Sequence, residues 1–178
     1  MKILGLVGSP RKNSNTDLLV SAVLAGAAKN KHTTQKVYLY NVEIAPCVDC
    51  KACKKGDFQC VLKDGMQKLY PKIQNADVIV FGTPLYWYGP SAKMKLLLDR
   101  LRPFIASKKL KDKKAVLLVP SEEGADACNH TVGMFNMSLG YLEMTLISVL
   151  LPKATERAEL KAQPDVLHQA QTIGKHIK

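Results

Sequence analysis

The sequence predicts an α/β protein in which a doubly wound, five-stranded parallel sheet lies between two layers of helices, a three-layer α/β/α arrangement. Strand-like and helix-like runs alternate along the 178 residues, and this alternation implies parallel strands joined by right-handed helical crossovers. The first run, residues 2–7, is almost continuously apolar, as is typical of a strand buried on both faces. For five strands the order 2-1-3-4-5 is a common solution, and ligands then bind at the carboxyl ends of strands one and three. The length fits a single domain over residues 1–178.

The first half of the chain supplies two helices and three strands. A helix is expected over residues 16–28, because apolar residues recur there at helical spacing. The second strand is expected over residues 37–40. A short helix should run over residues 64–73, although Pro71 must kink it or end it early. The third strand, residues 78–81, stops at a Gly-Thr-Pro turn.

The second half continues the same alternation. Its expected elements are a helix with Met94, Leu97, Leu98 and Leu101 on one side, strand four over 115–119, a helix over about 126–140, strand five over 145–151 and a closing helix over about 164–177. Cys128 lies within a helical pattern and is expected to be a small core residue.

The net charge of +11 raises the alternative of a nucleic-acid-binding module. The lysines are scattered, however, and the one dense run, residues 108–114, is interpreted as a solvated turn at the amino end of strand four. A basic surface would also attract anionic cofactors. No apolar run reaches the roughly 18 residues that a membrane span needs, and no cleavable signal is evident. We therefore expect a cytoplasmic protein with neither a nucleic acid nor a membrane as partner.

The turn after the first strand, residues 8–16, has the composition of an anion-binding loop, and we call it the phosphate turn. It ends at a predicted helix N-terminus, where free N–H groups and the helix dipole favour an anion. It is neither a P-loop nor a G-x-G-x-x-G fingerprint, because no Gly-Lys-Ser/Thr follows and the glycines are wrongly spaced. A polar surface turn is the alternative. The donors gathered in it favour a phosphate site: Ser9, Arg11, Ser14, Asn15 and Thr16.

The loop after strand three contains three consecutive aromatic residues, Tyr86, Trp87 and Tyr88. They cannot all face a core, so some must be exposed or must cover something flat. One interpretation is a platform against the isoalloxazine ring of a flavin. A hydrophobic dimer patch is a second interpretation, compatible with the first.

These two loops together resemble those of the NAD(P)H-dependent FMN reductase family, which has a flavodoxin-like fold. The resemblance is strongest toward its iron–sulfur flavoproteins and multimeric flavodoxins, and it covers roughly residues 1–125. It rests on Ser9-Pro10-Arg11 with Asn15-Thr16, and on Pro84-Leu85-Tyr86-Trp87 with Ser91, Lys95, Asp99 and Arg100.

The resemblance implies a set of site residues. Those expected to hold the FMN phosphate are Ser9, Arg11, Ser14, Asn15 and Thr16, and those expected to line the flavin are Pro84, Leu85, Tyr86, Trp87, Tyr88 and Gly89. Ser121 and Glu122, in the loop after strand four, would approach the ring from the other side. A homodimer or homotetramer with flavin near the interface is also implied. Asp99 and Arg100 are expected to form a helix-surface ion pair or a subunit contact.

Four of the five cysteines lie in one segment, residues 46–60, which we call the cysteine loop. Cys47, Cys50, Cys53 and Cys60 give C-x2-C-x2-C-x6-C, a spacing that allows three thiolates to wrap one face of a 4Fe–4S cluster. Zinc fits less well, because structural zinc sites usually take two separated cysteine pairs. Iron–sulfur flavoproteins carry a compact motif of this kind in the same place, while flavin-only relatives often keep such cysteines without a cluster. Reduced surface thiols are the remaining alternative.

The function expected from these features is an FMN-dependent oxidoreductase. It would take hydride from NAD(P)H and pass electrons to a quinone, a flavin or an iron–sulfur acceptor. No side chain is expected to act as a catalytic acid or base, because the flavin carries the chemistry. The alternative is a non-enzymatic electron carrier with the same FMN site.

Overall fold

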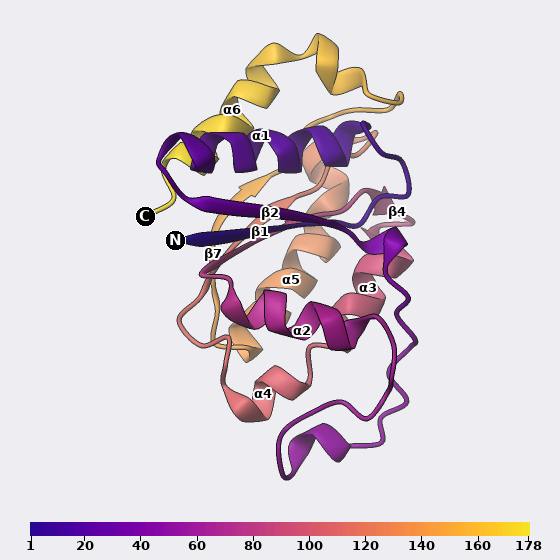
Figure 1. Ribbon diagram of the computed structural model, residues 1–178. Coiled ribbons are helices and arrows are strands. Elements are labelled where there is room, and N and C mark those ends of the chain that lie inside the picture. Colours follow the sequence, from indigo (N-terminus) through magenta and orange to yellow (C-terminus); the bar gives the residue numbers. More distant parts are fainter.

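The computed structural model describes residues 1–178 and contains the predicted sheet (Figure 1). Its five strands are β1 (Lys2–Val7), β2 (Thr33–Tyr38), β3 (Val78–Gly82), β6 (Lys114–Leu118) and β7 (Thr145–Leu150). They lie in the order β2-β1-β3-β6-β7, and every neighbouring pair is parallel. This confirms the expected order 2-1-3-4-5. The carboxyl ends of β1 and β3 are therefore adjacent where the winding reverses.

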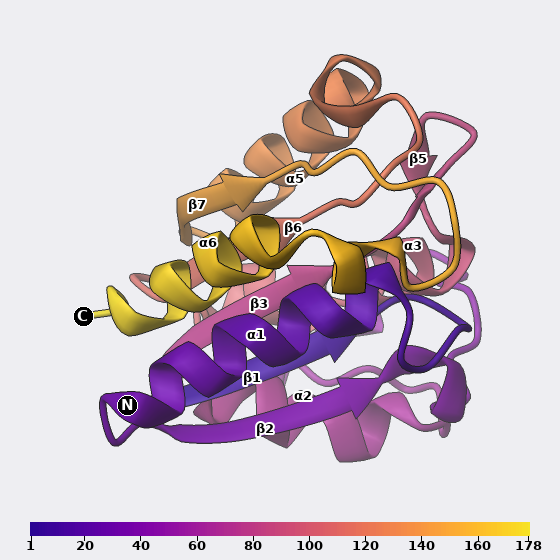
Figure 2. The same cartoon turned by 90° about the horizontal axis from the view of Figure 1, so that it is seen from above.

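Helices cover both faces of the sheet. They are α1 (Asn15–Lys29), α2 (Met66–Asn75), α3 (Ala92–Asp99), α4 (Pro103–Ser107), α5 (Asn129–Tyr141) and α6 (Pro164–Lys175). Helices α1 and α6 lie side by side on one face, and the other four belong to the opposite face (Figures 1 and 2). A small antiparallel hairpin, β4 (Leu85–Tyr86) and β5 (Gly89–Pro90), stands apart from the main sheet. Short 3-10 helices occupy Leu39–Asn41, Ala52–Lys54, Gly124–Cys128 and Glu159–Ala162.

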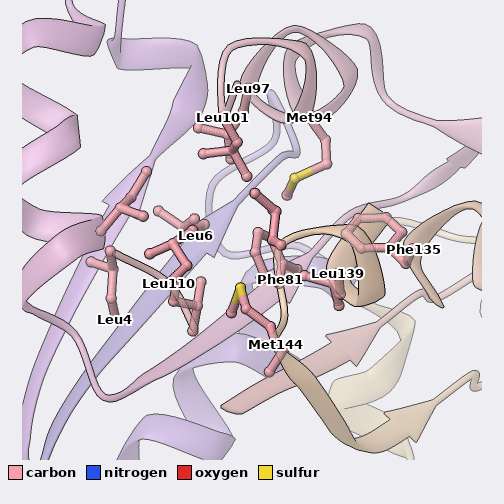
Figure 3. Packing of buried hydrophobic residues seen from close by; sticks show 14 of the residues in the cluster. Leu4, Leu6, Phe81, Met94, Leu97, Leu101, Leu110, Phe135, Leu139 and Met144 are labelled. Atoms are coloured by element: carbon pink, nitrogen blue, oxygen red, sulfur yellow. The ribbon is translucent and has the colours of Figure 1, made fainter. Parts of the chain in front are cut away.

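Each face of the sheet buries its own apolar cluster. Figure 3 shows the larger one, in which Phe81 of β3 packs edge-on against Phe135 of α5 with ring centroids 5.5 Å apart. Leu6 of β1 and Met94 of α3 belong to the same cluster. Cys128 is fully buried within this cluster, as expected. Burial of this apolar surface is the main stabilising term, and it fixes the strand ends from which the loops emerge.

Helices α1 and α6 touch backbone to backbone. A Cβ added at Gly26 would lie 2.0 Å from the carbonyl oxygen of Gln171, and one added at Gly174 would lie 1.9 Å from that of Val23. Only glycine allows this close approach, so the closing helix is fastened directly to the first one.

The boundaries of β2 differ most from the sequence-based expectation. Strand β2 begins at Thr33 rather than Val37. Its first half was missed because β2 is an edge strand, in which exposed and half-buried residues alternate there. The apolar signal used for the prediction therefore marks only its second half. The chain beyond Tyr38 turns into the 3-10 helix over Leu39–Asn41.

Of the two expected effects of Pro71, a kink or an early end, the early end does not occur, because α2 continues to Asn75. Proline removes one hydrogen bond of the helical ladder, but the buried side chains of Met66, Leu69 and Ile73 hold α2 against the sheet. None of the helices is long and apolar enough to span a membrane.

Candidate functional site

A cavity of about 290 Å³ opens at the carboxyl edge of the sheet, among the loops that follow β1, β3, β6 and β7. Ten of the thirteen predicted cofactor-binding residues line it: Ser9, Arg11, Ser14, Asn15, Thr16, Pro84, Leu85, Tyr86, Ser121 and Glu122. Trp87, Tyr88 and Gly89 do not. The cavity is near the lower end of the size range of small-molecule sites, and it is at the predicted switch point.

The phosphate turn lines one end of the cavity. Helix α1 begins at Asn15, and the preceding Ser14 makes no side-chain capping bond. The first N–H groups of a helix have no partner within it, so those of α1 remain available to a ligand. Ser9, Ser14 and Thr16 are each at most 5% exposed, which places their hydroxyls in a largely desolvated site where an anion is bound strongly.

Asn15 differs from its neighbours in the phosphate turn because its side-chain amide already makes two hydrogen bonds within the protein. Its Nδ2 donates to the carbonyl oxygen of Glu156 at 2.9 Å, and its Oδ1 accepts from the N–H of Leu160 at 3.2 Å. The side chain therefore ties α1 to the segment after β7. What Asn15 can still offer a ligand is its backbone N–H.

Behind the phosphate turn lies a buried acidic group, Asp17, which is 2% exposed. Its carboxylate accepts hydrogen bonds from the N–H of Asn13 at 2.7 Å, from Lys36 Nζ at 2.7 Å and from the hydroxyl of Tyr38 at 3.0 Å. Burial alone would raise the pKa of Asp17, but the bonds from Lys36, Asn13 and Tyr38 outweigh burial and lower this pKa below 3.8. Asp17 is therefore a charged group at neutral pH.

The loop that contains Tyr86, Trp87 and Tyr88 is a tight β4–β5 hairpin rather than an irregular loop. Trp87 and Tyr88 occupy its two-residue tip with φ of +51° and +60°, a left-handed conformation that bulky residues rarely adopt. Trp87 is 96% exposed, whereas Tyr86 lines the cavity. Thr131 of α5 donates to the carbonyl oxygen of Tyr88 at 3.1 Å, which fixes the tip. The hairpin thus presents one aromatic ring to the cavity and another to solvent.

The sequence-based reasoning missed one wall of the cavity. Pro120 and three residues after β7, Ala154, Thr155 and Glu156, also line it. Ser121 and Lys153 pair as an isolated bridge, which joins this segment to the loop after β6. The available signal was topological: the loop after the fifth parallel strand must emerge at the same edge of the sheet.

The cysteine loop lies apart from this cavity, and its four cysteines share a second, much smaller one of about 20 Å³. Cys53 is 8% exposed, Cys47 and Cys60 are half-buried, and Cys50 is exposed. No three Cys, His, Asp or Glu side chains of the chain stand together in a metal-binding arrangement. The donor set suits an iron–sulfur cluster, but the thiols would have to move closer together to hold one.

Arg100 anchors the start of the cysteine loop, and its predicted place on the helix surface is wrong. It is 1% exposed, and its Nη1 bonds Asp64 at 2.5 Å and the carbonyl oxygen of Ala45 at 2.8 Å. Burial alone would raise the pKa of Asp64, but the bonds from Arg100, Ala45 and Met66 lower it below 3.8. The Nε of Arg100 has no partner, and Arg100 lines the small cavity with the cysteines. Asp99 pairs instead with Lys95 at 2.7 Å.

Comparisons with known proteins identify the family and support the fold. A family model described as NADPH-dependent FMN reductase matches residues 1–156. The chain is 37% identical over 113 residues to an iron-sulfur flavoprotein of Methanocaldococcus jannaschii, with 64% of this chain and 58% of that protein covered. It is 41% identical over 100 residues to an iron-sulfur flavoprotein of Methanosarcina thermophila, with 56% of this chain and 52% of that protein covered.

The chain thus spans about half the length of the curated relatives it matches. Among solved structures it is similar to a flavone reductase, with a TM-score of 0.78 at 22% identity, covering 98% of this chain and 61% of that one. At this level of identity the likeness concerns the fold.

Proposed function

Because the chain belongs to the NADPH-dependent FMN reductase family, we propose that it is an FMN-dependent oxidoreductase that takes hydride from NAD(P)H and passes electrons to a quinone, a flavin or an iron–sulfur acceptor. The observation that carries the proposal is the cavity at the switch point, which joins an uncapped helix N-terminus to an aromatic side chain. A phosphorylated planar cofactor needs both features.

The residues of the cavity divide the work of holding FMN. The phosphate would be held by Ser9, Arg11, Ser14 and Thr16 together with the first N–H groups of α1, including that of Asn15. Pro84, Leu85 and Tyr86 would line the ring on one side, with Ser121 and Glu122 on the other. When bound, FMN supplies the hydride-accepting centre. The side chains bind and orient it and exclude water, and we assign none of them a catalytic acid–base role.

The exposed hairpin tip has a different part in the proposal. Trp87, Tyr88 and Gly89 do not line the cavity of the isolated chain. We propose that they cover the flavin ring from its open side or contact a second copy in a homodimer or homotetramer. A cytoplasmic location stays a prediction.

Flavin titration tests the cofactor assignment. Protein free of cofactor is titrated into FMN, and binding should quench flavin fluorescence at one site per chain. Stopped-flow mixing of the loaded protein with NADPH or NADH then separates enzyme from carrier, since only the enzyme is reduced rapidly by a nicotinamide. Unquenched FMN fluorescence at saturating protein would reject the assignment.

A second proposal concerns the cysteine loop, in which a 4Fe–4S cluster would be held by Cys47, Cys50, Cys53 and Cys60. Their shared cavity and the names of the two relatives support it. Arg100, whose Nε is buried without a partner, supplies a donor suited to an anionic cluster. Iron and sulfide analysis of anaerobically purified protein decides the matter, with a Cys53→Ser variant as control. Protein without iron under these conditions would remove the proposal.

A further inference from the structure

We propose that Lys36 is a positioning residue for the FMN phosphate, although it lies outside the cavity, because it neutralises the buried Asp17 carboxylate that shapes the phosphate turn. This inference rests on the proposed FMN site. It assigns a binding role to a lysine of β2 that no motif and no lining residue indicates.

Asp17 determines the shape of the phosphate turn through a bond to Asn13. Asn13 has φ of +55°, a left-handed conformation that Asn tolerates better than most residues. Its N–H donates to Asp17 Oδ2 at 2.7 Å. This bond fixes the bend that brings the chain from the turn into α1. The carboxylate of Asp17 therefore holds the N–H groups of Asn15 and Thr16 in position at the start of the helix.

The buried carboxylate of Asp17 would also repel an anionic ligand. Asp17 is the third residue of α1, in the same first turn that faces the proposed phosphate. It is 2% exposed, so water screens its charge poorly. An unneutralised carboxylate there would repel a phosphate dianion and would offset the attraction of the helix N-terminus.

Lys36 compensates the negative charge of Asp17. Lys36 Nζ lies 2.7 Å from Asp17 Oδ1 and 2.8 Å from Ser21 Oγ, and Ser21 and Tyr38 also donate to the carboxylate. The Nζ atoms of Lys36 and Lys12 lie 5.0 and 5.3 Å from the centroid of the Tyr38 ring. Of the two lysines, only Lys36 pairs with Asp17. It lets the carboxylate keep its structural bond to Asn13 without presenting a net negative charge to the ligand.

The experiment compares FMN with riboflavin, which has the same ring and no phosphate. Dissociation constants for both are measured by fluorescence quenching on wild type, Lys36→Met, Asp17→Asn and the double variant. Lys36→Met should weaken FMN binding about tenfold, because the uncompensated Asp17 carboxylate repels the phosphate dianion, with riboflavin binding unchanged. The double variant should recover wild-type FMN affinity, because an amide oxygen at position 17 can still accept from the N–H of Asn13.

The control is Lys29→Met, which removes the same charge from the last turn of α1 and should leave both constants unchanged. Equal weakening of FMN and riboflavin by Lys36→Met, or no recovery in the double variant, overturns the proposal. If Lys36→Met does not fold, Asp17→Asn decides, because removing the acid should tighten FMN alone, and unchanged FMN affinity rejects the inference. Failure of wild type to bind either flavin would reject the proposed function instead.

Discussion

The phosphate turn and the cysteine loop contain comparable numbers of chemically active side chains, but the fold holds them in opposite ways. In the phosphate turn, Asn13 alone among non-glycine residues is left-handed, and a buried carboxylate fixes it. In the cysteine loop, Asp49, Lys51 and Phe58 are all left-handed. The first region is built into the sheet edge, whereas the second is held near its start by two arginines. Arg100, the inner anchor, bonds Ala45 and Asp64, and Arg102, the outer anchor, pairs with Asp49.

The two regions should therefore respond differently to a ligand. The phosphate turn is preorganised, so binding there has little ordering cost. The cysteine loop has its donors gathered in one small cavity without a metal-binding arrangement, so the loop would have to rearrange for a cluster to bind.

The largest effect is expected at the inner anchor of the cysteine loop. Arg100→Met leaves the Asp64 carboxylate buried without its partner, and breaking such a pair costs about 3–5 kcal/mol in the free energy of unfolding. Urea denaturation followed by circular dichroism measures it. Lys95→Met, which breaks the exposed pair with Asp99, is the matched control and should cost about 0.5 kcal/mol or less. A loss below about 1 kcal/mol for Arg100→Met would show that the buried pair is not the anchor.

The next effect concerns ligand binding at the phosphate turn. Arg11→Ala removes a charge-assisted phosphate contact of about 1.5–3 kcal/mol, which should weaken FMN binding about ten- to a hundredfold. Arg11 is exposed, so the free energy of unfolding should not change. Fluorescence titration with FMN measures the affinity, and Lys72→Ala serves as the control. An unchanged dissociation constant would show that Arg11 does not contact the FMN phosphate.

Acid should weaken both regions through their buried carboxylates. The pKa values of Asp17 and Asp64 are lowered in the folded protein below 3.8. Their contribution to stability is therefore complete above the unfolded-state pKa and is lost as the pH falls through the folded-state pKa, by about 1.4 kcal/mol for each unit of lowering. Urea unfolding from pH 6 down to acid should show this decline, and Asp17→Asn should remove only its own share. A decline that Asp17→Asn leaves intact would contradict the assignment to Asp17.

The smallest effect is expected at the outer anchor. Arg102 pairs with Asp49, whose side chain is 61% exposed, and exposed pairs are worth about 0.2–1 kcal/mol. Arg102→Met should therefore change the free energy of unfolding far less than Arg100→Met. Equal losses for the two variants would mean that the cysteine loop is held as one cooperative unit.

The strand order, the switch point and most of the cavity could be predicted from the sequence, because they follow from local patterns. Apolar runs mark the strands, and the carboxyl ends of adjacent parallel strands meet at one edge. The residues of the phosphate turn are consecutive, so one turn brings them together. The resemblance of the two loops to the FMN reductase family is supported by the family match over residues 1–156.

What could not be predicted depends on long-range partners. Arg100 reads as a surface residue until Asp64, distant in sequence, is placed beside it. Asn15 reads as a phosphate ligand until Glu156 and Leu160 occupy its amide. Pro71 reads as a helix breaker until the packing of α2 is known. In each case a tertiary contact overrides a local preference.

Helix α1 is held near both ends by the segment that follows β7. Asn15 bonds to that segment at the mouth of the cavity, and Gly26 meets α6 near the other end. The stretch beyond residue 156, where the family match stops, therefore works as a brace rather than an appendage. A protease cut within α6 would release the far end of α1 and so weaken the proposed FMN site at its start, and a larger residue at position 174 would have the same effect without contacting the cavity.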